Sequence, residues 1–210
     1  MTPRRDIDEM LPAVALHAPK CPDPVALRWI RWAAREYCSR ARLWRDIDEI
    51  TVDRPEWQGL CSIEDASIVS IETAFLNGHK LDPVAVAWLD ENRPDWQFGE
   101  DEVGTARFVT QTAPNTLTIV PRESGTLKVR LVLQPSSTAF TLPAFLIDEH
   151  REEIALGAAG QILMTPAAEF ANPELGSILL QQFQSKRATA MVRTAKGQQG
   201  ARLRTKGSYV

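Results

Sequence analysis

Cysteine and histidine, the residues that most often staple small domains or hold metals, are scarce in this chain. The three cysteines, Cys21, Cys38 and Cys61, are widely spaced and form no Cys-x-x-Cys pair. Their odd number and spacing argue against a disulfide framework and against a zinc knuckle. We therefore expect reduced thiols in a cytoplasmic environment.

Long apolar runs are missing as well. No stretch approaches the roughly 18 apolar residues that a membrane-spanning helix needs. Residues 1–20 contain only a short apolar run that Pro12 interrupts, which is unlike a secretory signal. The sequence predicts a protein without a membrane partner.

Catalytic motifs are the third absence. The chain has no Gly-x-Ser-x-Gly, no phosphate-binding loop and no Gly-x-Gly-x-x-Gly. Of three histidines, His79 falls in a predicted turn, and His150, with Glu149 and Glu153, is interpreted as part of a solvated acidic helix start. We predict no catalytic residue, no metal and no cofactor, and hence no enzyme.

Charge, by contrast, is abundant and unevenly distributed. Residues 1–45 carry nine basic and five acidic side chains, whereas residues 46–105 carry three basic and fifteen acidic ones. Residues 185–210 carry seven basic side chains and no acid. An acidic middle repels nucleic acid, and a basic end is attracted to an acidic protein surface or a phosphate backbone.

Helical periodicity marks both ends of the chain. One helix is predicted from Asp23, as N-cap, with Pro24 in the first position, through to Trp44. Two more are predicted over residues 146–165 and 173–195. The apolar stripe expected on the second of these consists of Leu175, Ile178, Leu179, Gln182 and Phe183. The Gly-Ala-Ala-Gly run at 157–160 predicts that another helix approaches closely there.

Strand patterns occupy the middle. Apolar alternation predicts strands near residues 46–52, 67–76, 106–111, 116–121 and 126–133. Asn77-Gly78 predicts a hairpin turn, because both turn positions need a positive φ. A short helix is expected over residues 84–92, capped by Asp82-Pro83.

The resulting fold class is α+β, with one N-terminal and two C-terminal helices forming a bundle and an antiparallel β domain inserted between them. An extended C-terminal tail completes the chain. The predicted domains are residues 1–45 (an irregular lead-in over residues 1–20 and the first helix), 46–140 (β domain with a short helix), 141–195 (two bundle helices) and 196–210 (basic tail).

Two sets of residues are candidates for binding. On the first helix, Trp29 and Trp32 lie off the apolar stripe and are either anchors of a subunit interface or a second packing face within the subunit. The neighbouring arginines are interface candidates that would pair with the acidic middle of the same or another chain; they are Arg28, Arg31, Arg35 and Arg42.

The second set is the basic C-terminal end, which we interpret as a segment that docks on a partner, a solubilising terminus being the alternative. Its candidate residues are Lys186, Arg187, Arg193, Lys196, Arg202, Leu203, Arg204, Lys206 and Tyr209.

Several stretches resemble the head–tail adaptor (connector or neck) proteins of tailed bacteriophages. They are CPDPVALRWIRWAAREYCSRARLWRD from Cys21, SIVSIETAFLNGHKLDP from Ser67, LKVRLVLQPSSTAFTLPAFLIDEHREEIALGAAGQILMTP from Leu127, and NPELGSILLQQFQSKRATAMVRTA from Asn172.

The resemblance implies a structural virion protein assembled in the host cytoplasm. Such adaptors form a homo-oligomeric ring, typically of twelve copies, between the portal protein and a tail nozzle or tail tube protein. A C-terminal extension reaches the portal, and DNA passes through the channel without specific binding. The alternative from the residues alone is a DNA-binding or packaging accessory protein that uses the tail and the arginine stripe.

Overall fold

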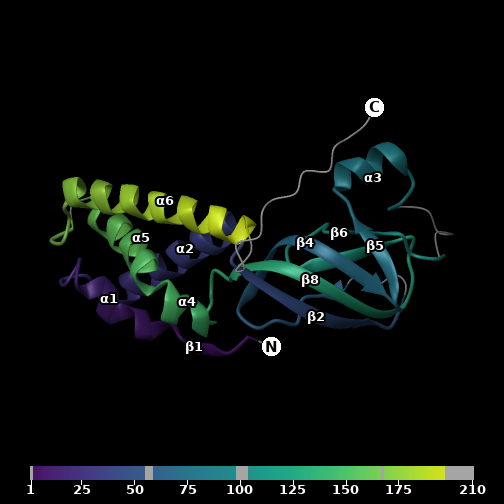
Figure 1. Ribbon diagram of the computed structural model, residues 1–210, viewed down its shortest axis with the longest axis horizontal. Helices are drawn as coiled ribbons and strands as arrows, with labels where there is room; N and C mark the ends of the chain where they lie inside the picture. Colours follow the sequence, from purple (N-terminus) through teal and green to yellow (C-terminus); the bar gives the residue numbers. More distant parts are fainter. Residues whose placement is uncertain (1, 55–58, 98–103, 167, 197–210) are drawn as a thin grey trace. The chain divides into compact units, whose positions relative to one another are not determined.

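The computed structural model describes residues 2–54, 59–97, 104–166 and 168–196, and it divides into two compact units (Figure 1). One, the sheet unit, comprises residues 44–134. The other, the helical unit, combines residues 2–43 with the chain from Pro135 onward. The fold is α+β, as the sequence predicts.

The helical unit is built from both ends of the chain. Its N-terminal part contains β1 (Arg4–Asp6), a 3-10 helix η1 (Ile7–Met10), α1 (Leu11–Ala15) and α2 (Asp23–Ala41). Its C-terminal part contains β9 (Thr141–Pro143), α4 (Ala144–Glu149), α5 (Arg151–Leu163) and α6 (Pro173–Ala195). The lead-in, expected to be irregular, pairs as β1 with β9, with Arg5 opposite Leu142.

Helix α2 begins where the sequence predicts but ends earlier. Pro22 is the N-cap and Asp23 is the first helical residue, so the prediction of Asp23 as N-cap is wrong by one position. The helix stops because Arg42 adopts a left-handed conformation with φ of 52°. Trp44, expected as the last residue of this helix, is instead the buried first residue of a strand.

Close packing between α5 and α6 follows from glycine on both helices. A Cβ atom added to Gly157 would lie 2.9 Å from the Phe183 ring, and one added to Gly160 would lie 2.7 Å from Cγ of Leu180. A Cβ atom added to Gly176 of α6 would lie 3.0 Å from the carbonyl oxygen of Gly160. The predicted close approach at 157–160 is confirmed.

Two helix predictions need correction. The single helix expected over 146–165 is two helices, because the backbone of His150 (φ −127°, ψ 18°) leaves the helical region between α4 and α5. The expected apolar stripe of α6 included Leu175 and Ile178, which are exposed. The buried residues are instead Gly176, Leu179, Phe183 and Ala190, because Gly176 and Phe183 are the positions that pack against the glycines of α5.

The sheet unit contains seven strands and a short helix among its described residues. They are β2 (Trp44–Val52), β3 (Gly59–Leu60), β4 (Ala66–Leu76), β5 (His79–Pro83), α3 (Val86–Asn92), β6 (Phe108–Thr110), β7 (Thr116–Val120) and β8 (Gly125–Pro135). The strand order is β2-β8-β4-β5-β6-β7-β3, and the sheet nearly closes on itself.

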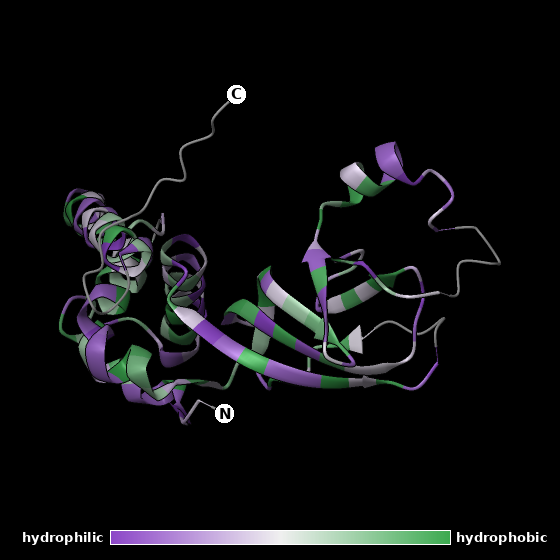
Figure 2. Ribbon diagram, turned by 45° about the vertical axis from the view of Figure 1, so that its right-hand side comes forward, coloured by the Kyte–Doolittle hydropathy of each residue, from purple (hydrophilic) through white to green (hydrophobic). Residues whose placement is uncertain are grey.

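Strands β2 and β8 form a ladder of nine residue pairs and show the predicted alternation. Ile50 lies opposite Leu127, and Glu49 lies opposite Lys128. Leu127, Val129 and Leu131 are buried while Lys128 is exposed. Hydrophilic and hydrophobic residues alternate along the long strands in Figure 2, as expected of a sheet with one wet face.

The Asn77-Gly78 turn is confirmed. Both residues have a positive φ, 49° and 87°, and they connect β4 to β5. The side-chain oxygen of Asn77 also accepts a hydrogen bond of 3.1 Å from the Thr126 amide, which fastens the turn to β8. One turn residue thus joins three strands.

The β domain is mixed rather than antiparallel, which corrects the prediction. Strands β5 and β6 run parallel, with Asp82 opposite Phe108. Parallel neighbours need a long crossover, and the connection that contains α3 supplies it. A separate small core forms under α3 from Leu89, Trp96 and Val120. Asp82-Pro83 belongs to β5, and Ala85 is the residue that precedes the helix.

Candidate interaction surfaces of the helical unit

Two of the four candidate arginines on α2 are held within the helical unit. Nε of Arg31 donates a hydrogen bond of 2.6 Å to the carbonyl oxygen of Ala139. A guanidinium nitrogen of Arg35 donates one of 3.2 Å to the carbonyl oxygen of Pro135. Their acceptors within the chain are backbone oxygens of the segment 135–140, and pairing with the acidic residues of another chain stays a prediction. Arg28 and Arg42 are exposed.

The two candidate tryptophans are half-buried and contact each other. The rings of Trp29 and Trp32 meet edge to face, with centroids 5.8 Å apart. Trp32 also lies 6.2 Å from Phe183 of α6. Of the two alternatives, packing within the subunit accounts for the Trp32 contacts, while Arg28 lies over the ring of Trp29 at 5.5 Å.

The aromatic contacts continue into the unit to His150. Phe183 lies 6.0 Å from Tyr37, and the Tyr37 ring lies 5.2 Å from the imidazole of His150. Oη of Tyr37 is 3.4 Å from Nδ1 of His150. The expectation that His150 lies on a solvated helix face is therefore wrong, because half-burial and the α4–α5 break place it against α2.

Burial lowers the pKa of His150 below its usual value, and Arg193 acts in the same direction, while Glu153 and Glu149 oppose the shift. A base whose pKa is lower in the folded state than in the unfolded state stabilises the fold fully above the unfolded pKa. That stabilisation is lost as the pH falls from about 6.5 through the folded-state pKa.

We therefore expect the helical unit to unfold at lower temperature at pH 5 than at pH 7.5, and expect a His150→Gln variant to lose part of this dependence. Thermal unfolding followed by circular dichroism at both pH values measures it. The control is the His79→Gln variant, because His79 is exposed and is the first residue of β5 in the sheet unit, not part of the turn as predicted. Equal pH dependence in His150→Gln and the parent would contradict the role of His150.

The structure describes the basic residues of the predicted docking segment up to Lys196. Lys186, Arg187 and Arg193 are helical residues of α6, not parts of an extended tail. Arg187 forms an ion pair of 3.0 Å with Glu36 of α2 and lies over the Phe183 ring. It is therefore half-buried and engaged in the bundle, whereas Lys186, Arg193 and Lys196 are exposed.

The remaining candidates of this segment lie outside the described residues. They are Arg202, Leu203, Arg204, Lys206 and Tyr209.

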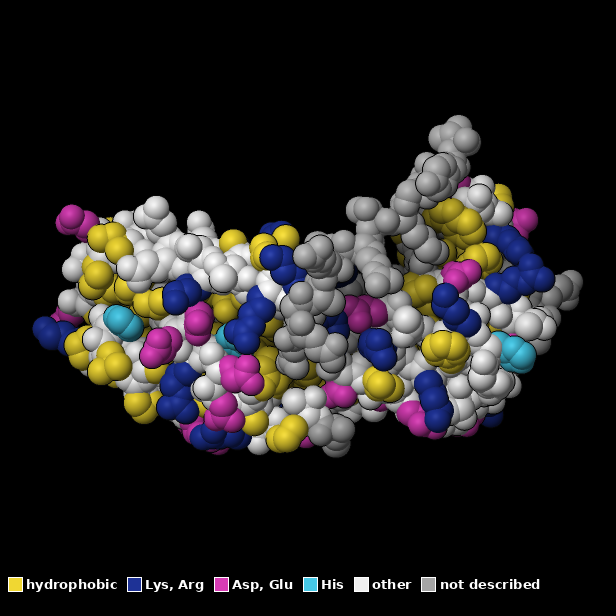
Figure 3. Space-filling model, viewed as in Figure 1, with side chains coloured by type: hydrophobic (Ala, Val, Ile, Leu, Met, Phe, Trp, Pro, Cys, Tyr) yellow, Lys and Arg dark blue, Asp and Glu magenta, His cyan; other side chains and the backbone are white. Residues whose placement is uncertain are grey.

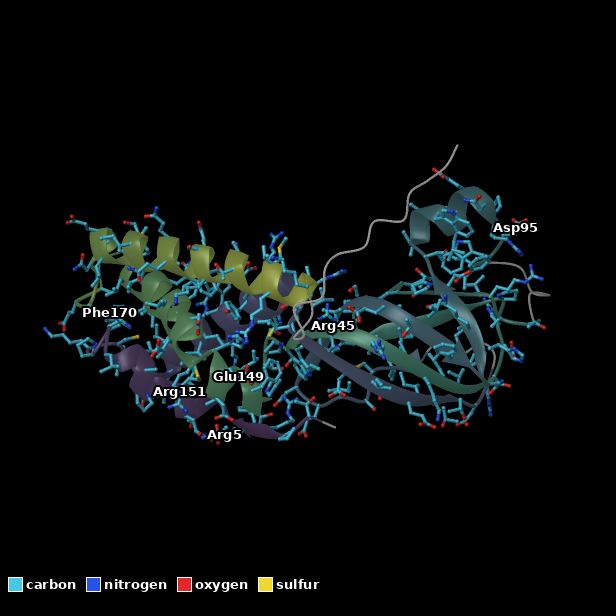
Figure 4. All side chains as sticks on the ribbon, in the orientation of Figure 1. Arg5, Arg45, Asp95, Glu149, Arg151 and Phe170 are labelled. Atoms are coloured by element: carbon cyan, nitrogen blue, oxygen red, sulfur yellow. The ribbon has the colours of Figure 1, made fainter. Side chains whose placement is uncertain are left out.

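Sequence reasoning missed Glu36 as the anchor for α6. A signal was available, because Glu36 is the one acid on α2 after the first turn and stands among arginines. A second anchor, Arg5, forms ion pairs with Glu9 and Asp148 and so connects β1 to α4; Figure 4 labels it below that helix.

Opposite charges are concentrated in different units. By sequence, the sheet unit (44–134) has eight basic and sixteen acidic residues, a net charge of −8. The helical unit (2–43 and 135–210) has sixteen basic and eleven acidic residues, a net charge of +5. The charge difference thus follows the structural division and is not confined to the C-terminal end.

The chain matches no protein-family model, and no curated protein sequence is significantly similar to it. Two kinds of site are absent from the part of the chain that the structure describes. Among these residues, no three His, Cys, Asp or Glu side chains gather in a way that would hold a metal ion. Within the same residues, none of the helices combines the length and apolar composition needed to cross a bilayer.

Burial makes two of the cysteine thiols harder to deprotonate. It raises the pKa of Cys38 in α2, and it raises the pKa of Cys61 to about 11. Thiols with raised pKa values are poor nucleophiles at neutral pH, because the thiolate is the reactive form.

Proposed function

We propose that the chain is a head–tail adaptor of the tailed-bacteriophage type, a structural component of the virion neck. In this role it forms a ring of twelve copies between the portal and a tail nozzle or tail tube protein. Its basic C-terminal segment docks on the portal, and DNA passes through the ring without specific binding.

The charge division between the two units carries this proposal. A chain with a net charge of −8 in one compact unit and +5 in the other has two different surfaces that attract each other between copies. Contacts between unlike patches are those that build rings. An acidic unit also suits a channel for DNA, since affinity for DNA comes largely from phosphate neutralisation by Lys and Arg.

The end of α6 supports the docking role. Arg193 is exposed in its last turn and Lys196 is exposed directly after it, and the sequence continues through fourteen residues that contain three basic side chains and no acid. The helix thus ends in positive charge that the bundle does not use, which suits a carboxylate-rich partner surface.

The alternative, a DNA-binding accessory protein, depends on the arginines of α2. Two of them, Arg31 and Arg35, donate to backbone carbonyls and so offer fewer free donors to phosphates. A gel-shift series at several salt concentrations tests this alternative, because phosphate binding weakens steeply with salt.

A truncation after Lys196 tests the proposal. We expect the shortened protein to keep its fold, because α6 stays intact, and to bind portals more weakly in co-sedimentation, because the truncation removes the part of the docking segment after Lys196 with its three basic residues. Truncation at residue 186 would be uninformative, since it would also remove Arg187 and the buried Ala190 from the bundle.

A matched pair of full-length variants shows whether portal binding depends on the charge of the C-terminal segment or only on its presence. Replacing Arg202, Arg204 and Lys206 by serine should weaken portal binding, whereas replacing Gln198 and Gln199 by serine should leave it unchanged. Normal attachment of the truncated protein to portals would overturn the docking role.

A further inference from the structure

Helix α6 has an outer surface that its own unit leaves uncovered. At steps of three and four residues, six exposed positions form what we call the outer stripe: Leu175, Ile178, Gln182, Ser185, Thr189 and Val192. The side chains of Ile178 and Val192 are 46% and 52% exposed. This spacing is typical of a helix that packs along another helix.

The outer stripe has no charged residue over a helix about 34 Å long. In Figure 3 the surface over α6 is largely uncharged, with acidic atoms near its start and basic atoms near its end. The hydroxyl of Thr189 donates to the carbonyl oxygen of Ser185, so it is satisfied within the helix. A surface of this kind fits an uncharged helix rather than a nucleic acid or an acidic peptide.

The stripe is complementary to itself when two copies lie antiparallel. Leu175 of one copy then faces Val192 of the other, Ile178 faces Thr189, and Gln182 faces Ser185. Apolar residues meet at both ends, and two polar residues that can hydrogen-bond meet in the middle.

The charges beside the stripe favour the same orientation. Glu174 lies in the first turn of α6, and Lys196 follows its last turn. Antiparallel pairing brings each Glu174 to the basic end of the other helix and opposes the two helix dipoles. Parallel pairing would place like charges together at both ends.

We propose that the free protein forms a two-fold dimer through the outer stripe of α6, with the two helices antiparallel. The occupant of this surface is a second copy of the chain. The contact is isologous and therefore complete after two copies, so it does not build a ring. It does not depend on the proposed adaptor function.

Sedimentation equilibrium of the full chain over a hundredfold concentration range tests the dimer. We expect a monomer–dimer equilibrium, weak because one helix pair buries less than a standard interface. Ile178→Glu should weaken it at least about tenfold, because it would bury a carboxylate that faces the uncharged Thr189 of the other copy. Gln184→Glu, on the same helix but off the stripe, should leave it unchanged.

Charge reversal tests the orientation. Glu174→Lys should weaken the dimer, because position 174 faces the basic Arg193 of the other copy, and combining it with Arg193→Glu should restore it. Thermal unfolding of each variant verifies that the fold is retained; if Ile178→Glu fails to fold, Val192→Glu replaces it.

A monomeric mass at all concentrations would overturn the proposal, as would a dimer equally affected by Ile178→Glu and Gln184→Glu. A double variant that fails to recover association would overturn the antiparallel arrangement. The measurement uses no portal, so its failure is distinguishable from failure of the adaptor proposal.

Discussion

Replacing Gly160 with leucine is expected to destabilise the helical unit by about 3 kcal/mol or more, at the upper end of what overpacking causes. The first added carbon would already lie 2.7 Å from Cγ of Leu180 and 3.2 Å from the carbonyl oxygen of Gly176. The second neighbour is backbone, which no rotamer change can move. The whole of α6 would therefore have to shift away from α5.

The Gly160→Ala change tests the same contact, because we expect its effect on the unfolding free energy to be opposite to that of Gly→Ala in an ordinary helix. In the interior of an exposed helix, alanine stabilises by about 1 kcal/mol relative to glycine. Here the contact distances are shorter than real Cβ contacts allow, so we expect Gly160→Ala to destabilise the unit.

Thermal and urea unfolding followed by circular dichroism at 222 nm measure both changes. Glu152→Leu is the matched control, since it adds the same side chain at an exposed position of α5, and it should change the unfolding free energy by less than about 0.5 kcal/mol. A Gly160→Leu protein as stable as the parent would show that α5 and α6 are not in close contact.

Local signals in the sequence predicted most of the elements. Pro24 near the start of α2, the Asn77-Gly78 turn and the alternation in β8 each depend on neighbours a few residues away. Their backbone preferences are therefore visible in the chain itself. The early end of α2 was missed because Arg42 adopts a left-handed conformation without glycine.

Errors concentrated where distant residues decide the outcome. The parallel pairing of β5 with β6 depends on the crossover through α3, and antiparallel pairing is the commoner choice for neighbouring strands. The α4–α5 break occurs at His150, whose ring packs against Tyr37, a residue 113 positions away in sequence. Periodicity alone continues the helix through that point.

The candidate site shows the same limit. Arg31 and Arg35 were recognised as interface candidates, but their acceptors are carbonyl groups 108 and 100 positions away in sequence, and backbone acceptors have no sequence signature. The Gly-Ala-Ala-Gly run did predict a helix contact, because small side chains are a local feature with a long-range consequence.

Phe183 is the position where truncation should cost most. It is 1% exposed, packs between Trp32 and Tyr37, and lies under the Arg187 guanidinium. Phe183→Ala should destabilise the helical unit by about 3–5 kcal/mol, the range for removing a buried phenyl ring. Gln184→Ala, at the adjacent exposed position, is the control and should be close to neutral.

The Phe183 ring also explains why position 157 is a glycine. A double-mutant cycle separates the contact between these two residues from the cavity that Phe183→Ala leaves. Gly157→Ala alone should destabilise, because its Cβ would lie 2.9 Å from the ring. In the Phe183→Ala background the obstacle is gone, so the same change should become neutral or stabilising through helix propensity. We expect a coupling of about 1–3 kcal/mol between the two positions. Additive effects of the two substitutions, measured by urea unfolding, would show that Gly157 is required for another reason than the aromatic ring.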